Sequence, residues 1–193
     1  MTTENTPVAT IVGTLVGQKE FPGGGRFVIT VYDLLAMPVD AIINAANGGL
    51  AHGGGVAAAI ARAAGPAFDE ACDRYVAQHG YIPTGQAAVT SAGQLPFKGI
   101  IHAIGPRLGE GNEEAKLVGA LQHAFRLAQD RGWASLAFPA VSSGIFSVPL
   151  ETCVRAYLRA VREFFAEFPN SSVRLIYLAV YDGPIVEMMK KSL

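Results

Sequence analysis

The sequence is poor in cysteine and has no excess of basic residues. Only two of its 193 residues are cysteines, Cys72 and Cys153, and neither has the paired spacing of a zinc site or redox motif. Fifteen Lys and Arg residues against sixteen Asp and Glu residues give a formal net charge of -1, so no general positive field attracts duplex nucleic acid. We therefore expect reduced thiols, and any bound phosphate must be held locally.

Long hydrophobic runs are also missing. The N-terminus has no basic stretch followed by an apolar one, and no apolar run approaches the roughly 18 residues that a membrane span needs. We therefore expect a soluble cytoplasmic protein, and a monomer by default. Half of the residues are hydrophobic, which at this length predicts one domain over 1–193 with a hairpin region at 1–25.

Strand-like and helix-like segments alternate along the chain. A glycine-rich turn at 21–25 separates two β-rich segments and predicts an antiparallel hairpin. The later apolar runs are short, as in central strands that are covered on both faces, and the amphipathic patterns between them predict helices. The expected strands are 8–16, 26–32, 40–46, 86–90, 99–104, 135–138 and 173–181. The expected helices are 56–64, 66–78, 113–131, 150–168 and 184–193.

This alternation predicts an α/β fold with three layers. A mixed, mostly parallel sheet should lie between helices, and the N-terminal hairpin should add antiparallel strands. Ligands of such sheets bind beyond the carboxyl ends of the strands. Two small-residue connections between a strand and a helix, at 44–56 and 139–147, are therefore the candidate site.

The first connection carries three consecutive glycines, Gly53, Gly54 and Gly55, directly before a helix. Glycines let the backbone approach a ligand closely and can direct their N–H groups at an anion, although a tight turn explains them equally well. The spacing excludes the dinucleotide-dehydrogenase and P-loop motifs. In the second connection, Ser142 and Ser143 lack the G-x-S-x-G pattern of a hydrolase nucleophile, which disfavours that role.

None of the four histidines has metal-ligand spacing, so no metal and no cofactor are predicted. His79 and His123 fit solvated positions on helices. His102 lies within an apolar strand, where a hydrogen-bonded core residue is expected. His52 differs because it adjoins the glycines of the first connection.

Five motifs in the same order along the chain resemble the macrodomain family. They are Asp33-Leu34-Leu35 with the strand-and-loop segment 39–47, His-Gly-Gly-Gly-Val at 52–56, and the segments 101–106, 138–146 and 178–182. The resemblance covers about residues 26–193, and His-Gly-Gly-Gly-Val-Ala at 52–57 is typical of the viral and archaeal type. It implies a three-layer α/β/α macrodomain that holds ADP-ribose in a cleft at the crest of the sheet.

The resemblance also implies roles for single residues. Asp33 would accept a hydrogen bond from the adenine amine, and Tyr181 would stack on the ring; otherwise they are a turn cap and the end of a core strand. Asn47 would bind the distal ribose, Asn44 would support the turn or join that contact, and Phe146 would pack against the ribose. Backbone N–H groups of both loops would bind the two phosphates. The implied ligand-binding set is Asp33, Leu34, Asn44, Asn47, Gly53, Gly54, Gly55, Val56, Ser142, Ser143, Gly144, Ile145, Phe146 and Tyr181.

The implied function is to bind ADP-ribose and to hydrolyse mono-ADP-ribose from modified proteins, with deacetylation of O-acetyl-ADP-ribose as a related activity. Some hydrolytic members carry an Asp where this chain has Ala57, so the implied mechanism is substrate-assisted water attack with Asn47 and His52 as catalytic residues. A non-catalytic ADP-ribose reader is the alternative. A nucleic-acid partner such as poly(A) is disfavoured by the charge, and no membrane partner is expected.

Overall fold

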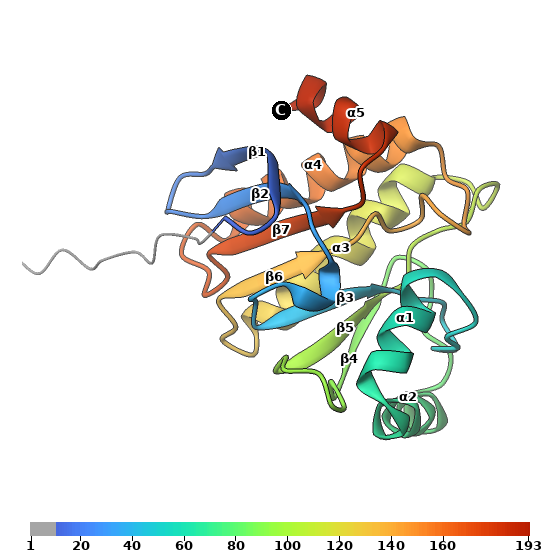
Figure 1. Ribbon diagram of the computed structural model, residues 1–193. Coiled ribbons are helices and arrows are strands. Elements are labelled where there is room, and N and C mark those ends of the chain that lie inside the picture. Colours follow the sequence, from blue (N-terminus) through green and yellow to red (C-terminus); the bar gives the residue numbers. More distant parts are fainter. Residues whose placement is uncertain (1–10) are drawn as a thin grey trace, which may run out of the picture.

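The computed structural model describes residues 11–193, in which strands and helices alternate around one seven-stranded sheet (Figure 1). The strands are β1 (Thr14–Glu20), β2 (Arg26–Val31), β3 (Ala41–Ala45), β4 (Ala87–Thr90), β5 (Gly99–Ala103), β6 (Ser135–Phe138) and β7 (Leu175–Val180). The α-helices are α1 (Gly55–Ala64), α2 (Pro66–His79), α3 (Glu113–Gln129), α4 (Leu150–Glu167) and α5 (Pro184–Ser192). A single 3-10 turn, η1 (Leu34–Ala36), follows β2 and was not expected from the sequence.

The strand order is β1-β2-β7-β6-β3-β5-β4. The four inner pairs, from β2 to β5, are parallel, whereas the two edge pairs, β1 with β2 and β4 with β5, are antiparallel. The predicted mixed, mostly parallel sheet is thus confirmed. Because the inner strands run in one direction, their carboxyl ends meet at one edge of the sheet.

Helices cover both faces of this sheet, as the apolar strands require. Successive strand residues point to opposite faces, so Ile42 packs in the core beneath α1 and α2 while Ile43 packs in the core beneath α3 and α4. On β7, Tyr177 packs in the same core as Ile42, and Leu178 packs in the same core as Ile43. The two cores make the predicted three layers, and α1 and α2 lie on the opposite side of the sheet from α3 and α4 in Figure 1.

The N-terminal hairpin forms, but its first strand lies later than predicted. Residues 8–10 of the expected strand 8–16 lie outside the described residues, and β1 begins at Thr14 and continues to Glu20. The turn at 21–25 closes as predicted, with the Phe21 N–H donating to the Gly25 carbonyl at 2.8 Å. The polar residues Gln18, Lys19 and Glu20 are tolerated in β1 because it is an exposed edge strand.

The strand at 86–90 was expected in the middle of the sheet, and this prediction was wrong. It forms β4 at the edge and runs antiparallel to β5. Only residues 91–98 connect the two strands, which is too short for the crossover that parallel neighbours need. All other predicted helices and strands have bounds within two residues of those observed.

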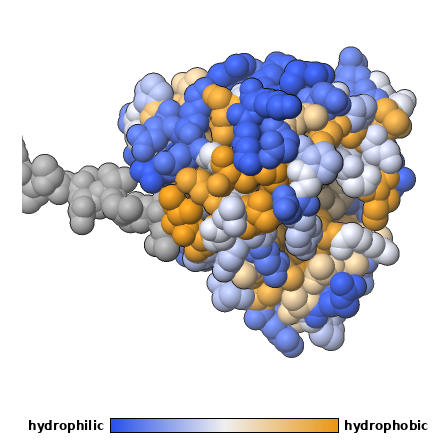
Figure 2. Space-filling model, turned by 45° about the horizontal axis from the view of Figure 1, so that its top comes forward, coloured by the Kyte–Doolittle hydropathy of each residue, from blue (hydrophilic) through white to orange (hydrophobic). Residues whose placement is uncertain are grey.

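Hydrophobic side chains gather in the middle of the face shown in Figure 2, and hydrophilic ones occupy its upper part. Of the large hydrophobic side chains that stay exposed, Ile145 and Tyr181 are among the most accessible, at 73% and 79%. Both follow strands of the inner sheet. Over residues 11–193, none of the helices has the length and the apolar character required to span a bilayer.

The Tyr157 hydroxyl on α4 supports the loop after β6. It is fully buried and donates a 2.5 Å hydrogen bond to the Val141 carbonyl. We expect Tyr157→Phe to lower the free energy of unfolding by about 1–3 kcal/mol, because a buried carbonyl loses its partner. Urea denaturation followed by circular dichroism measures the change. Tyr75→Phe, which removes a hydroxyl without a partner among the described residues, is the control; equal effects of the two variants would contradict the assignment.

Candidate functional site

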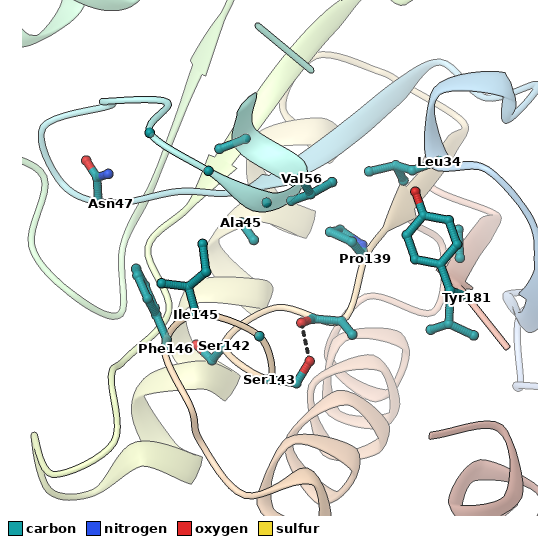
Figure 3. A pocket seen from close by; sticks show the side chains of 18 of the residues that line it. Leu34, Ala45, Asn47, Val56, Pro139, Ser142, Ser143, Ile145, Phe146 and Tyr181 are labelled. Carbon is teal, nitrogen blue, oxygen red and sulfur yellow. Dashed lines mark hydrogen bonds between the residues drawn. The ribbon is translucent and has the colours of Figure 1, made fainter. Parts of the chain in front are cut away.

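A cavity of about 470 Å³ lies at the edge of the sheet where the parallel strands end. Its wall contains the first residues after β2 and β7, Tyr32 and Tyr181, and the last residue of β3, Ala45. The loop between β3 and α1 and the loop between β6 and α4, here called the first and second loop, supply most of the rest. The structure therefore brings the two predicted connections to a single cavity (Figure 3).

The first loop presents free backbone donors to this cavity. Gly53, Gly54, Gly55 and Val56 line the wall, and within residues 11–193 none of their N–H groups has an acceptor. Gly54 caps α1 without any side-chain hydrogen bond, so the first turn of the helix keeps its orphan donors. These donors and the positive end of the helix dipole favour an anion at this wall.

The second loop presents a similar set from the other side. In the described part of the chain, the N–H groups of Gly144, Ile145 and Phe146 also have no acceptor. The loop is held open by its own bonds: the Ser143 hydroxyl donates to the Ala140 carbonyl at 2.7 Å, drawn as a dashed line in Figure 3. Ser142 has a left-handed φ of 68°, and its buried Oγ has no hydrogen-bond partner among residues 11–193. Such a strained, unsatisfied residue is typical of a binding site.

Ile145 reaches across the cavity from the second loop to the first. A Cβ placed on Gly54 would lie 3.1 Å from Ile145 Cδ1, and one on Gly55 would lie 3.5 Å from the same atom. Figure 3 shows this side chain pointing toward the first loop. The glycines therefore also leave room for the Ile145 side chain, which a Cβ at Gly54 would contact at 3.1 Å.

Asn47 lies at one end of the cavity, and its side chain also organises the first loop. Its Nδ2 donates to the Ala51 carbonyl at 2.7 Å, and its Oδ1 accepts from the Ala51 N–H at 3.1 Å. One amide hydrogen and one lone pair stay available for a ligand. From the sequence we expected Asn47 to bind the distal ribose and to take part in catalysis, and the structure adds a loop-forming role.

The opposite end of the cavity is apolar and aromatic. Tyr181 is exposed and lies with Leu34 at this end, far from Asn47 and Phe146 (Figure 3). Asp33 does not line the cavity; its Oδ1 caps η1 by accepting from the Leu35 N–H at 3.0 Å. Asp33 precedes Leu34 directly and its second carboxylate oxygen has no partner in residues 11–193, so it lies beside the cavity with an acceptor to spare.

Asn44 lies behind the first loop and not in the cavity wall. It is fully buried on β3, and its Nδ2 lies 3.2 Å from Nδ1 of His102. His102 Nε2 lies 2.8 Å from the Thr90 hydroxyl, which donates to the Ser91 carbonyl. Asn44, His102 and Thr90 therefore form a continuous chain of buried polar contacts. The sequence prediction that Asn44 supports the turn fits this place better than a ligand contact.

His52 is also turned away from the cavity. Its ring stacks on Phe68 with centroids 5.0 Å apart, and neither ring nitrogen has a hydrogen-bond partner in the described residues. Burial lowers the pKa of His52, although the carboxylates of Asp69 and Asp73 oppose this effect. The ring thus packs against Phe68 and is not part of the cavity wall.

Several cavity residues were missed by the sequence prediction. Arg107 follows β5 by four residues, and its guanidinium carbon lies 4.6 Å from the centre of the Phe146 ring. The Leu108 N–H donates to the Phe146 carbonyl at 2.8 Å, which ties this connection to the second loop. The rule that ligands bind at the ends of parallel strands would have indicated both Tyr32 and Arg107. Ala57, the position at which some hydrolytic relatives were expected to carry an Asp, also lines the cavity.

Acidic and thiol groups are not assembled into a metal centre. Over residues 11–193, no group of three or more His, Cys, Asp and Glu side chains could hold a metal ion. Burial raises the pKa of both thiols, Cys72 and Cys153, to about 11, so they are protonated and inert at neutral pH.

The buried histidine behind the first loop makes stability depend on pH. Complete burial lowers the pKa of His102 from 6.5 to about 3, so the unfolded chain binds a proton below pH 6.5 that the folded chain does not. We expect the free energy of unfolding to fall by about 2 kcal/mol between pH 7 and pH 5 through this residue. Urea denaturation at several pH values measures the slope, and His102→Gln should reduce it. An unchanged slope in that variant would overturn the assignment.

Gly105, just after β5, lets the second loop approach the sheet. A Cβ at this position would lie 2.2 Å from Ser142 Oγ and 2.9 Å from Val141 Cγ1. We expect Gly105→Ala to lower the free energy of unfolding by about 1–3 kcal/mol because it overpacks this contact. Gly144→Ala, in the second loop itself, is the control, since its Cβ would meet nothing within 4 Å among residues 11–193. Thermal unfolding compares the two; a harmless Gly105→Ala would show that the loop is not held by this contact.

Comparison with known proteins begins with the Macro domain family, whose model matches residues 43–157. The chain is 41% identical over 152 residues to an Escherichia fergusonii protein named O-acetyl-ADP-ribose deacetylase, covering 78% of this chain and 85% of that protein. It is also 41% identical over 170 residues to a Thermotoga maritima protein, covering 87% of this chain but 28% of that protein.

Solved structures give the same result. An Oceanobacillus iheyensis macrodomain with ADP has a TM-score of 0.83 and 28% identity, covering 91% of this chain and 94% of that one. A Trypanosoma brucei macrodomain in complex with ADP-ribose has a TM-score of 0.77 and 28% identity, covering 86% and 68%. Since the family model also matches more than half of the residues, this chain belongs to the macrodomain family.

Proposed function

We propose that the protein binds ADP-ribose and hydrolyses mono-ADP-ribose from modified proteins, with deacetylation of O-acetyl-ADP-ribose as a second activity of the same site. The observation that carries this proposal is the pair of glycine-bearing loops whose free N–H groups line one cavity from both sides. Relatives named O-acetyl-ADP-ribose deacetylase and a related structure with ADP-ribose support the ligand class.

The two ends of the cavity suit the two ends of the ligand. Tyr181 offers an exposed ring on which adenine stacks, and the free carboxylate oxygen of Asp33 accepts from the adenine amine. The diphosphate lies between the loops, where N–H groups replace a basic patch. The distal ribose then lies at the other end, between Asn47 and the ring of Phe146.

Hydrolysis in this site depends on the positioning of the water and the ribose, without a side chain that acts as a base. Ala57 lies in the cavity and supplies no acid or base, so a diphosphate oxygen of the substrate orients the attacking water. The water oxygen bonds to the anomeric carbon of the distal ribose, the C–O bond between that carbon and the side-chain carboxyl group breaks, and the carboxylate leaves with the electron pair. The water gives up one proton to the solvent. Asn47 orients the ribose hydroxyls. The loop N–H groups stabilise the negative charge of the leaving carboxylate. His52 acts through the loop that it supports and not through contact with the ribose.

A non-catalytic ADP-ribose reader is the second candidate. It is favoured by Ala57, because the cavity wall formed by residues 11–193 contains no Asp or Glu near the first loop. Binding of free ADP-ribose does not separate the two functions, whereas release of label from a modified protein does.

We expect Asn47→Ala to lower the rate of label release from an automodified mono-ADP-ribosyltransferase by about 100-fold, because the reacting ribose loses its orientation. The affinity for free ADP-ribose, measured by calorimetry, should fall less, because Tyr181 and the second loop keep their contacts although the first loop loses its two hydrogen bonds from Asn47. Binding by the wild type without any label release would establish the reader instead, and failure to bind ADP-ribose at all would refute the proposed function.

A further inference from the structure

Arg107 is the only residue with a charged side chain in the cavity wall as described over residues 11–193. It is exposed, and its guanidinium lies over the Phe146 ring at 4.6 Å from the centroid. A cation stacked on an aromatic face is held in a fixed orientation and gains about 0.5–1 kcal/mol at an exposed site. Arg107 is thus a positioned charge and not a freely moving surface side chain.

No acidic group within residues 11–193 neutralises this charge. Glu110 is close in sequence, but its carboxylate accepts from the Arg107 backbone N–H at 3.0 Å and lies 3.8 Å from Lys116 Nζ. The Glu113 carboxylate accepts from the N–H groups of Gly109 and Gly111. The guanidinium therefore keeps its full charge and its planar set of donors for an outside acceptor.

The position of Arg107 indicates which part of a substrate it meets. Phe146, on which it stacks, lies at the Asn47 end of the cavity, opposite Tyr181 (Figure 3). If the proposed function holds, this is the end of the distal ribose, from which the modified protein leaves the cavity. The diphosphate is already served by the N–H groups of both loops. The free charge at the mouth thus faces the protein part of the substrate.

We propose that Arg107 determines substrate specificity by binding carboxylates that flank the ADP-ribosylated residue of the target protein. A planar guanidinium forms paired hydrogen bonds with a carboxylate, and stacking on Phe146 fixes the plane in advance. The preferred substrate class is then mono-ADP-ribose on an acidic protein segment. This inference rests on the proposed function, because it needs the distal ribose at the Asn47 end.

The test uses two peptides that carry ADP-ribose through a non-hydrolysable linkage, one flanked by Asp and Glu and one by Asn and Gln. The wild type should bind the acidic peptide about fivefold more tightly, the scale of one exposed ion pair, and Arg107→Gln should abolish this preference. Arg107→Lys, which keeps the charge but loses the planar stack, should retain part of it. Added salt should weaken the preference because it screens exposed charges.

Arg131→Gln is the matched control. Arg131 also lies over an aromatic ring, 5.7 Å from the centroid of Trp133, but it lies outside the cavity wall, so its loss removes one charge without changing the preference. Free ADP-ribose should bind wild type and Arg107→Gln equally. If Arg107→Gln weakened the binding of free ADP-ribose and of both peptides by the same factor, the proposal would be overturned and Arg107 would be assigned to the diphosphate. No preference in the wild type would also overturn it, whereas failure of free ADP-ribose to bind would refute the proposed function itself.

Discussion

The site of this protein depends on backbone N–H groups that line one cavity from both sides and have no acceptor within the described residues 11–193. They exist because two loops leave parallel strands at the same edge of the sheet and because Gly54 starts α1 without a side-chain cap. Main-chain donors can hold a diphosphate without any basic patch. This is why a chain with a net charge of -1 can be well suited to an anionic ligand.

The loops are held from behind by buried groups that do not touch the cavity. Tyr157 of α4 fixes the Val141 carbonyl, and the Asn44–His102–Thr90 chain of hydrogen bonds lies beneath the first loop. Burial keeps the His102 pKa low, so this chain stays neutral and directional at physiological pH. Such support orders the loops before a ligand arrives, which reduces the entropy cost of binding.

The cavity has an aromatic end at Tyr181 and a polar end at Asn47. Within residues 11–193, Arg107 is the only charged residue that lines it. This arrangement matches a ligand made of a flat ring, a diphosphate and a sugar. It also separates recognition of the nucleotide, which depends on rings and amides, from recognition of whatever is attached beyond the sugar. Arg107 lies in the wall of this cavity and stacks on Phe146.

The sequence by itself determined the three-layer fold, the two loops and most helix and strand bounds, because hydrophobic period and glycine placement are local properties that each segment carries alone. Only the tertiary structure decided which way side chains face. It moved β4 to an antiparallel edge, stacked the His52 ring on Phe68 outside the cavity wall, and brought Arg107 onto Phe146. These outcomes depend on connection length and on packing between residues far apart in the chain, and neither is encoded in a local pattern.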